Sequence, residues 1–533
     1  MNIARTICTI RYQSINKRFS RKITIGNRYE SSSTQPQVKD EKYNFEDLKV
    51  LERVERRKAK IPPFMKNVFV SIFDRDLLAF PEILNKDESE ALDQRVAALD
   101  RVFSDPDKTI EDRKNALKGT KMYAAPVALT DNGLAVNHTE SLRYLEAIST
   151  DLKLSQQISD HWVGLNALKI GLAEDMYQKV INDLISGENT IALCIRERVA
   201  ERISQADFRT TAEVDERGVW RISGEKICLQ SSEYYLVLSI VDTTRLKMFL
   251  VHPGAYGVSH NGTYVTFMKT PALPLDMATE ENLAKTLGVS RLYTASLCRS
   301  SLLQAMKIIT EYITPRTFSG KPMSEVSTIR SVIGEALLNI YASESAEYFT
   351  AGLLDGYMDP DAELEIAMCR SGDTNFNLLG CSGIMSERDD PKLNLYLAEH
   401  LHPSLRVPSE QLEYCVLRMK FSCETLLSRH GMDVTNAFTE LSRMAEAGSE
   451  ILAMTAVLAR ASRSYCIGLR NAEVEMKLAA CFVESSKERV KKLILEVNDG
   501  EYLNLDKFKT TFGRKVLETK SVLVEKPTAR VFW

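Results

Sequence analysis

The sequence predicts an α+β fold, and three observations support this prediction. In residues 41–190, apolar side chains recur at the spacing of a helix, for example over 88–102. Residues 191–285 consist of short β-rich runs that are separated by Gly, Pro or Asp. From Leu287 onward the helical spacing returns. Helices, then a β barrel or sandwich, then helices again make an α+β layout.

The same patterns place the individual elements in order. The first helical part is expected to hold helices at 88–102, 142–158 and 174–188. The β-rich part contains the runs TIALCI, GVWRISG, YYLVLSIVD and LKMFLVHPG. Further helices are expected near 291–312, 324–355 and 362–380, and then over 410–430, 433–468 and 471–497. The tail after Leu503 is mixed in character.

Composition excludes several classes of protein. The 533 residues are 44% hydrophobic and carry a net charge of −3, so no global field attracts nucleic acid. No apolar run reaches the ~18 residues of a membrane-spanning helix, so any membrane contact must be peripheral. The ten cysteines form no C-x-x-C pair, and His400 and His402 have no further ligand nearby, so no metal site is expected.

The N-terminal segment differs from the rest of the chain. Residues 1–29 contain seven Lys or Arg and no Asp or Glu, and apolar residues recur at roughly helical spacing. This pattern predicts a mitochondrial transit peptide, with a disordered basic tail as the alternative. Residues 31–40 are typical of a linker.

Four stretches of the sequence resemble segments of the acyl-CoA dehydrogenase family. They are KNVFVSIFDRDLLAFPEI (66–83), ISDHWVGLNALKIGLAEDMYQKVINDLISGE (158–188), TPRTFSGKPMSEVSTIRSVIGEALLNIYASESAEYFTAGLLD (314–355) and ILAMTAVLARASRSYCIGLRN (451–471). The third is similar to the family's R-x-Q-F-G-K-P-L-x-E-F segment and the helix after it. The last is similar to a C-terminal extension of the very-long-chain branch, which includes member nine, an assembly factor for respiratory complex I.

The resemblance implies the family's domain order and a homodimer. It predicts a transit peptide and linker over 1–35, an N-terminal helical domain over 36–190 and a middle β-domain over 191–285. It also predicts a C-terminal four-helix bundle over 286–415 and a helical extension over 416–533.

The carboxylate base of the family reaction is missing from its expected position. The reaction removes the α-proton of a fatty-acyl thioester and passes the β-hydride to FAD. In most members the base is the first Glu of E-G-T-N-E, after a G-G-x-G turn. Alignment on the turn at 380–383 and on Pro391 puts Arg406 at this position and keeps the second Glu as Glu410. Without a two-residue insertion the position is Ser404. A guanidinium stays protonated and cannot act as a base.

The alternative position for the base in this family also lacks a carboxylate. It lies on the helix before R-x-Q-F-G and corresponds here to Ser290, beside Arg291. Glu311 and Glu325 flank this region and are expected to be solvated surface acids. No catalytic residue is therefore assigned.

The FAD site is only partly retained. The family's T-E-P-x-x-G-S-D loop corresponds to 196–203 and keeps only Glu197, while the Trp that packs on the flavin ring is Cys228. The Gln and Phe of R-x-Q-F-G are Phe318 and Ser319. Four residues remain as vestigial candidates for FAD binding: Arg316, Gly320, Gly380 and Gly383. Alternatively, Arg316 caps the preceding helix and the glycines only turn the chain.

The extension carries an apolar stripe formed by Ile451, Met454, Val457, Leu458 and Ala461. Such a stripe packs in a bundle or dimer, or it contacts lipid. By resemblance, residues 433–470 would contact the inner mitochondrial membrane peripherally. The prediction is a non-catalytic mitochondrial scaffold, on the matrix side of the inner membrane, with complex I assembly proteins as partners. The alternatives are an active FAD-dependent dehydrogenase of long-chain acyl-CoAs, and a module that holds acyl-CoA without turnover.

Overall fold

The computed structural model describes residues 52–53, 55–58, 63–198, 208–242, 245–277, 279–358, 360–372, 391–525, 527–528 and 530. Within these ranges the chain forms two compact units. The larger unit contains 52–58 and 80–372, and the smaller unit contains 63–79 and 391–530. The predicted transit peptide and linker over 1–35 lie outside the described residues.

With the exception of the last, the first helices of the larger unit begin at side-chain caps. They are α4 (Lys86–Phe103), α5 (Ile110–Gly119), α6 (His138–Ile148), α7 (Leu152–Gly171) and α8 (Glu174–Ile185). Asn85 and Glu88 form a reciprocal capping box at α4, and Asn137 and Glu140 form another at α6. Each box satisfies backbone N–H groups that have no partner within the helix.

The single helix predicted over 142–158 is wrong, because the chain forms two helices there. α6 ends at Ile148, and α7 begins after Asp151, whose carboxylate accepts a hydrogen bond from Leu154 N at 3.2 Å. The hydroxyl of Ser149 donates to Glu146 O at 2.7 Å. Short polar side chains that bond the nearby backbone stop one helix and start the next, although the apolar spacing continues across them.

The predicted β-rich part forms a closed sheet. Its strands are β1 (Ile191–Cys194), β2 (Thr211–Val214), β3 (Trp220–Ile227), β4 (Tyr234–Val241), β5 (Arg245–Val251), β6 (Val258–His260) and β7 (Tyr264–Pro274). The order is β1-β4-β2-β3-β7-β5, and β5 also pairs with β4, which closes the ring. β1 adds in parallel to β4, and α7 packs on β1. The ring encloses a core that includes Val237, Phe249 and Phe267.

Long helices follow the sheet, as predicted. α9 (Glu280–Ile313) and α10 (Ser327–Gly356) are joined by a hairpin of β8 (Thr317–Phe318) and β9 (Lys321–Pro322). α11 (Glu363–Gly372) packs on both helices. The rest of the helix predicted over 362–380 lies outside the described part of the chain.

A buried arginine joins α6, α9 and α10. The Arg299 side chain is fully buried, and its guanidinium pairs with Glu347 at 2.9 Å, with Glu344 at 3.4 Å and with Glu146. The hydroxyl of Tyr348 also donates to Glu146 at 2.9 Å. Burial lowers the pKa of Arg299, but the three carboxylates outweigh this effect and raise it. The guanidinium is therefore fixed in its charged form.

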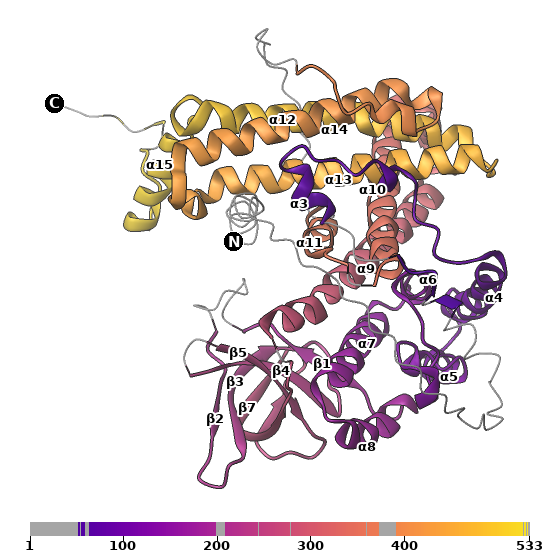
Figure 1. Ribbon diagram of the computed structural model, residues 1–533, viewed down its shortest axis with the longest axis vertical. Coiled ribbons are helices and arrows are strands. Elements are labelled where there is room, and N and C mark those ends of the chain that lie inside the picture. Colours follow the sequence, from indigo (N-terminus) through magenta and orange to yellow (C-terminus); the bar gives the residue numbers. More distant parts are fainter. Residues whose placement is uncertain are drawn as a thin grey trace, which may run out of the picture. The chain divides into compact units, whose positions relative to one another are not determined.

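The smaller unit is helical. It contains α3 (Phe64–Val68), a short 3-10 turn at Arg75–Leu78, α12 (Arg406–His430), α13 (Phe438–Cys466), α14 (Ala472–Leu503) and α15 (Asp506–Thr519). Figure 1 shows α12, α13 and α14 lying along one another, with α15 at one end of this bundle. α12 runs without a break through 415–416, where a domain boundary was predicted. Among the described residues, no helix combines the length and the apolar character needed to cross a membrane.

The apolar stripe of the extension packs inside this bundle. Ile451, Met454, Val457, Leu458 and Ala461 each have 0% exposed surface. The bundle alternative is therefore confirmed for the stripe, and lipid contact through it is wrong for the folded chain. The wider prediction of membrane contact through 433–470 stays a prediction.

Candidate functional site

The predicted position of the base lies on the surface of the smaller unit. Arg406 is the first residue of α12, and its side chain is 76% exposed. Its Nε lies 3.0 Å from Oε1 of Glu410, one helical turn later. Arg406 and Glu410 thus form a surface ion pair within α12. A positive charge in the first turn is unfavourable against the helix dipole, and Glu410 offsets this.

A carboxylate that the sequence interpretation missed lies further along α12. Glu413 is 2% exposed and accepts hydrogen bonds from Leu395 N at 2.6 Å and Leu397 N at 3.2 Å. It fixes the segment before α12. Both of its oxygens are thus used to satisfy backbone donors, which is a structural role. The helical spacing could not have indicated this, because seven residues are about two turns and the spacing therefore places Glu413 on the same face as exposed Arg406.

The alternative position of the base is also occupied by a structural group. Ser290 lies half-buried in α9, and its hydroxyl donates to Leu287 O at 2.6 Å. A serine hydroxyl that bonds its own helix has no neighbouring base to activate it.

The hairpin between α9 and α10 explains two of the vestigial FAD candidates without a ligand. Phe318 pairs with Lys321, and the two residues between them, Ser319 and Gly320, have φ values of 51° and 76°. Two positive φ angles fit a type I′ turn, which favours glycine. The guanidinium of Arg316 stacks on Tyr312, 3.7 Å from the ring centroid. Gly380 and Gly383 lie outside the described residues.

The loop after β1 is held by a buried ion pair. The Lys226 side chain is 0% exposed, and its Nζ lies 2.7 Å from Oε1 of Glu197. Thr210 donates to the same carboxylate from its backbone N at 3.1 Å and from its hydroxyl at 3.0 Å. The ring of Phe208 lies 4.4 Å from Nζ. Burial lowers the pKa of Lys226, and Glu197 opposes this shift. The one loop residue that the sequence retains therefore has a structural role.

The described part of this region does not fit a stacked flavin. Cys228 is buried in the core of the β-domain, and its Sγ donates to Gln230 O at 3.0 Å. A thiol that points into the sheet offers no flat aromatic face to a flavin ring. The carboxylate of Glu197 is already occupied by Lys226 and Thr210. Residues 199–207 of the loop lie outside the described part.

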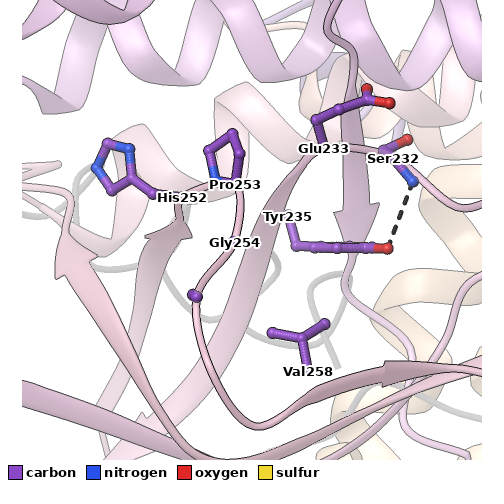
Figure 2. A pocket seen from close by; sticks show the side chains of 8 residues that line it. Ser232, Glu233, Tyr235, His252, Pro253, Gly254 and Val258 are labelled. Atoms are coloured by element: carbon purple, nitrogen blue, oxygen red, sulfur yellow. Dashed lines mark hydrogen bonds between the residues drawn. The ribbon is translucent and has the colours of Figure 1, made fainter.

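One small cavity lies at the start of β4 and the end of β5, and Figure 2 shows its lining. Its volume is about 190 Å³, below the ~300 Å³ at which cofactor pockets begin. The Tyr235 hydroxyl accepts from Ser232 N at 3.4 Å, and the Glu233 carboxylate accepts from Thr190 N at 2.8 Å. The cavity is lined by Ser232, Glu233, Tyr235, His252, Pro253, Gly254, Ala255 and Val258. It is too small for FAD or acyl-CoA.

His161 and Trp162 are core residues, and both are fully buried. The indole N–H of Trp162 donates to Met122 O at 2.7 Å. Nδ1 of His161 accepts from Ile191 N at 3.2 Å, so Nε2 is the donor to Tyr123 O at 3.0 Å. His161 therefore joins α7, the 122–124 turn and β1 as a neutral imidazole.

Buried His161 should make the larger unit sensitive to acid. Burial lowers the pKa of His161 to about 4, against about 6.5 in the unfolded chain. Below pH ~6.5 the unfolded state therefore binds more protons than the folded state. The free energy of unfolding should fall by about 3 kcal/mol as the pH decreases from ~6.5 to ~4. His161→Gln keeps a donor and an acceptor but does not titrate, so it should reduce this loss.

Urea unfolding followed by tryptophan fluorescence between pH 4 and 8 checks this expectation. Neighbouring Asp160 acts in the opposite direction, because burial raises its pKa to about 7. Since Asp160 is present in both proteins, the difference between wild type and His161→Gln isolates the histidine. Parallel pH profiles of the two proteins would contradict the role given to His161.

No metal centre is found among the residues that the structure describes, where no three His, Cys, Asp or Glu side chains gather. His402 caps the turn at Pro403–Leu405 and contacts the ring of Tyr465. Of the described cysteines, Cys298, Cys466 and Cys481 are exposed, whereas the others are buried.

Comparison with known proteins identifies the C-terminal region. Residues 403–522 match the family model "ACAD9/ACADV, C-terminal domain". This match begins just before α12 and ends shortly after α15.

Solved structures identify the fold. An acyl-CoA dehydrogenase complexed with FAD from Bacillus anthracis superposes with a TM-score of 0.65 and 13% sequence identity, over 82% of this chain and 93% of that chain. Butyryl-CoA dehydrogenase from Megasphaera elsdenii matches with a TM-score of 0.46 and 14% identity, over 70% and 97% of the two chains. The first similarity confirms the predicted fold class. The chain has the acyl-CoA dehydrogenase fold, and its residues 403–522 are similar to the ACAD9/ACADV C-terminal domain.

Proposed function

We propose that this chain is a catalytically inactive relative of the acyl-CoA dehydrogenases and serves as an assembly factor for respiratory complex I. One observation carries the proposal. Arg406, at the predicted position of the base, is a surface cation that pairs with Glu410 over 3.0 Å. A general base contributes ~10²–10⁴ in rate, and an arginine cannot supply this contribution.

The other positions support the same conclusion. The Ser290 hydroxyl bonds its own helix, and Glu197 is held by Lys226 and Thr210. Glu413 is engaged by two backbone donors. In each case the hydroxyl or carboxylate group is used to stabilise the fold and is not available to act on a substrate.

The proposal includes a location and partners. The basic, acid-poor residues 1–29 support import into mitochondria, and the ACAD9/ACADV C-terminal domain supports a role beside complex I assembly proteins at the inner membrane. We further propose a homodimer. Exposed apolar side chains around the α9–α10 hairpin would suit a second subunit: Ile308, Tyr312, Phe318 and Val332.

Purification and assay test the proposed function. The isolated full-length chain should lack a flavin absorbance band, and it should oxidise palmitoyl-CoA at least ~10²-fold more slowly than an active dehydrogenase. The chain recovered from mitochondria should accompany complex I assembly intermediates, at an elution volume that fits a dimer. Saturable oxidation of palmitoyl-CoA by a yellow protein would instead support an FAD-dependent dehydrogenase.

The variant Arg406→Glu should not restore turnover, because the Glu197 loop and Cys228 are altered as well. Arg406→Gln is the matched control, since it removes the charge without adding a carboxylate. Loss of an exposed pair costs at most about 1 kcal/mol, so both variants should fold. Substantial oxidation by Arg406→Glu alone would show that the flavin site is intact.

A further inference from the structure

Two cysteine thiols meet in the core of the β-domain. Cys194 is the last residue of β1 and is 0% exposed, and Cys228 directly follows β3 and is 6% exposed. Both belong to the same cluster of buried side chains, and they are hydrogen-bonded to each other. Since Sγ of Cys228 donates to Gln230 O at 3.0 Å, the thiol of Cys194 is the donor in the bond between the two cysteines. The two sulfur atoms are therefore direct neighbours.

The backbone holds the two cysteines on adjacent segments. Glu197 pairs with Lys226 in an antiparallel bridge, and Ile227 N donates to Arg196 O at 2.8 Å. The segment that leaves β1 thus runs along the end of β3. Adjacent strands lie ~4.8 Å apart, and a disulfide joins Cα atoms that are about 4.4–6.8 Å apart. A bond between the two sulfur atoms therefore needs little movement of the main chain.

The surroundings make the two thiols unequal. Burial raises the pKa of Cys194, although the ammonium of Lys226 opposes this shift. The hydrogen bond from Cys194 lowers the pKa of Cys228, although burial and the carboxylate of Asp160 oppose this effect. The thiolate is the reactive form of cysteine. Cys228, which is also the more exposed of the two, should therefore react first.

The buried cysteines of the smaller unit provide a contrast. Cys415 and Cys423 lie in α12, and burial raises the pKa of each to about 12. A thiol that stays protonated at neutral pH reacts slowly with oxidants. Burial of a cysteine alone thus does not make it reactive, and the neighbouring thiol distinguishes Cys228.

We propose that Cys194 and Cys228 form a peroxide-sensitive dithiol, in which Cys228 is oxidised first and Cys194 closes a disulfide with it. The Cys228 thiolate attacks one oxygen of hydrogen peroxide, the O–O bond breaks, and a sulfenic acid and hydroxide form. The Cys194 sulfur then attacks the sulfenic sulfur, and the S–O bond breaks to release water. Together the two thiols lose two electrons and two protons, and one peroxide becomes two waters.

The disulfide ties the end of β1 to the end of β3. A small oxidant such as a peroxide suits the site, because Cys228 is only 6% exposed. The inference goes beyond the proposed function, since the reaction needs neither a flavin nor a partner protein.

Peptide mapping of the full-length chain tests the proposal. The reduced protein is treated with hydrogen peroxide, alkylated under denaturing conditions and analysed by mass spectrometry. Cys194 and Cys228 should be recovered as a disulfide-linked pair, and dithiothreitol should restore both thiols. The extent of oxidation at Cys423, the buried control, should be at least about tenfold lower. Cys481, which is exposed, shows that the peroxide dose was sufficient.

Three serine variants separate the roles of the two thiols. Cys194→Ser should accumulate a sulfenic acid at Cys228 that dimedone traps, whereas Cys228→Ser should leave Cys194 reduced. Cys423→Ser is the matched control and should form the same disulfide as wild type. Circular dichroism checks that the variants are folded, and the map of wild type decides the question even if a variant is not.

Free thiols at both Cys194 and Cys228 in wild type, at a dose that oxidises Cys481, would overturn the proposal. So would a sulfinic acid at Cys228 beside a free Cys194 thiol, because Cys194 would then fail to close the disulfide. Flavin content and the recovery of complex I intermediates are measured separately. A negative result here would therefore leave the proposed function standing.

Discussion

Replacing Arg299 by alanine should lower the free energy of unfolding of the larger unit by about 3–5 kcal/mol. The side chain is completely buried and faces the carboxylates of Glu146, Glu344 and Glu347. Its removal leaves negative charges in the interior without the cation that holds them. The effect should be large because an unpaired buried charge keeps its full desolvation cost.

Urea unfolding followed by tryptophan fluorescence measures this effect, since Trp162 and Trp220 both lie in the larger unit. The matched control is Arg406→Ala, which removes an exposed arginine from a surface pair and should change stability by less than about 1 kcal/mol. If the two variants differed little, the buried network would be far less important than its geometry indicates.

The second large effect is expected at Lys226. Lys226→Ala leaves Glu197 in the β-domain with only the hydrogen bonds from Thr210, so it should destabilise the larger unit by about 3 kcal/mol. The double variant Lys226→Met/Glu197→Leu removes both charges and should recover most of this loss, because two apolar side chains replace a buried ion pair.

Arg198→Ala is the control for Lys226→Ala. Arg198 pairs with Glu225 at 2.8 Å, and both side chains are at least 40% exposed. Its loss should cost less than about 1 kcal/mol. A Lys226→Ala protein as stable as Arg198→Ala, or a double variant no better than the single one, would contradict the structural role of the pair.

Much of the fold could be predicted from periodicity, because burial imposes a repeat on the sequence. The runs around β1, β3, β4 and β5 and the long helices α10, α13 and α14 lie where the pattern placed them. The error at 142–158 has a local cause. Apolar spacing continued across Ser149 and Asp151, whose side chains end one helix and begin the next.

The site could be predicted less well, because neighbours decide what a side chain does. The sequence indicates that Arg406 replaces the family base and that Glu410 is the retained second Glu, but their mutual ion pair follows only from α12 starting at Arg406. Glu197 was read as a surviving flavin-loop residue, whereas Lys226 and Thr210 hold it. The partner of Glu197 lies 29 residues away, and no local pattern could indicate it.

The closed ring of strands has a consequence for how the chain is made. The ring cannot close until Leu273 and Pro274 reach Leu250 and Phe249, so the ribosome must first release all of β7. Before then β3 and β5 expose unpaired backbone groups, which invite association with other nascent chains. During its synthesis the middle domain is therefore prone to aggregate until β7 has been released. A chaperone that binds the unpaired strands would protect it in this period.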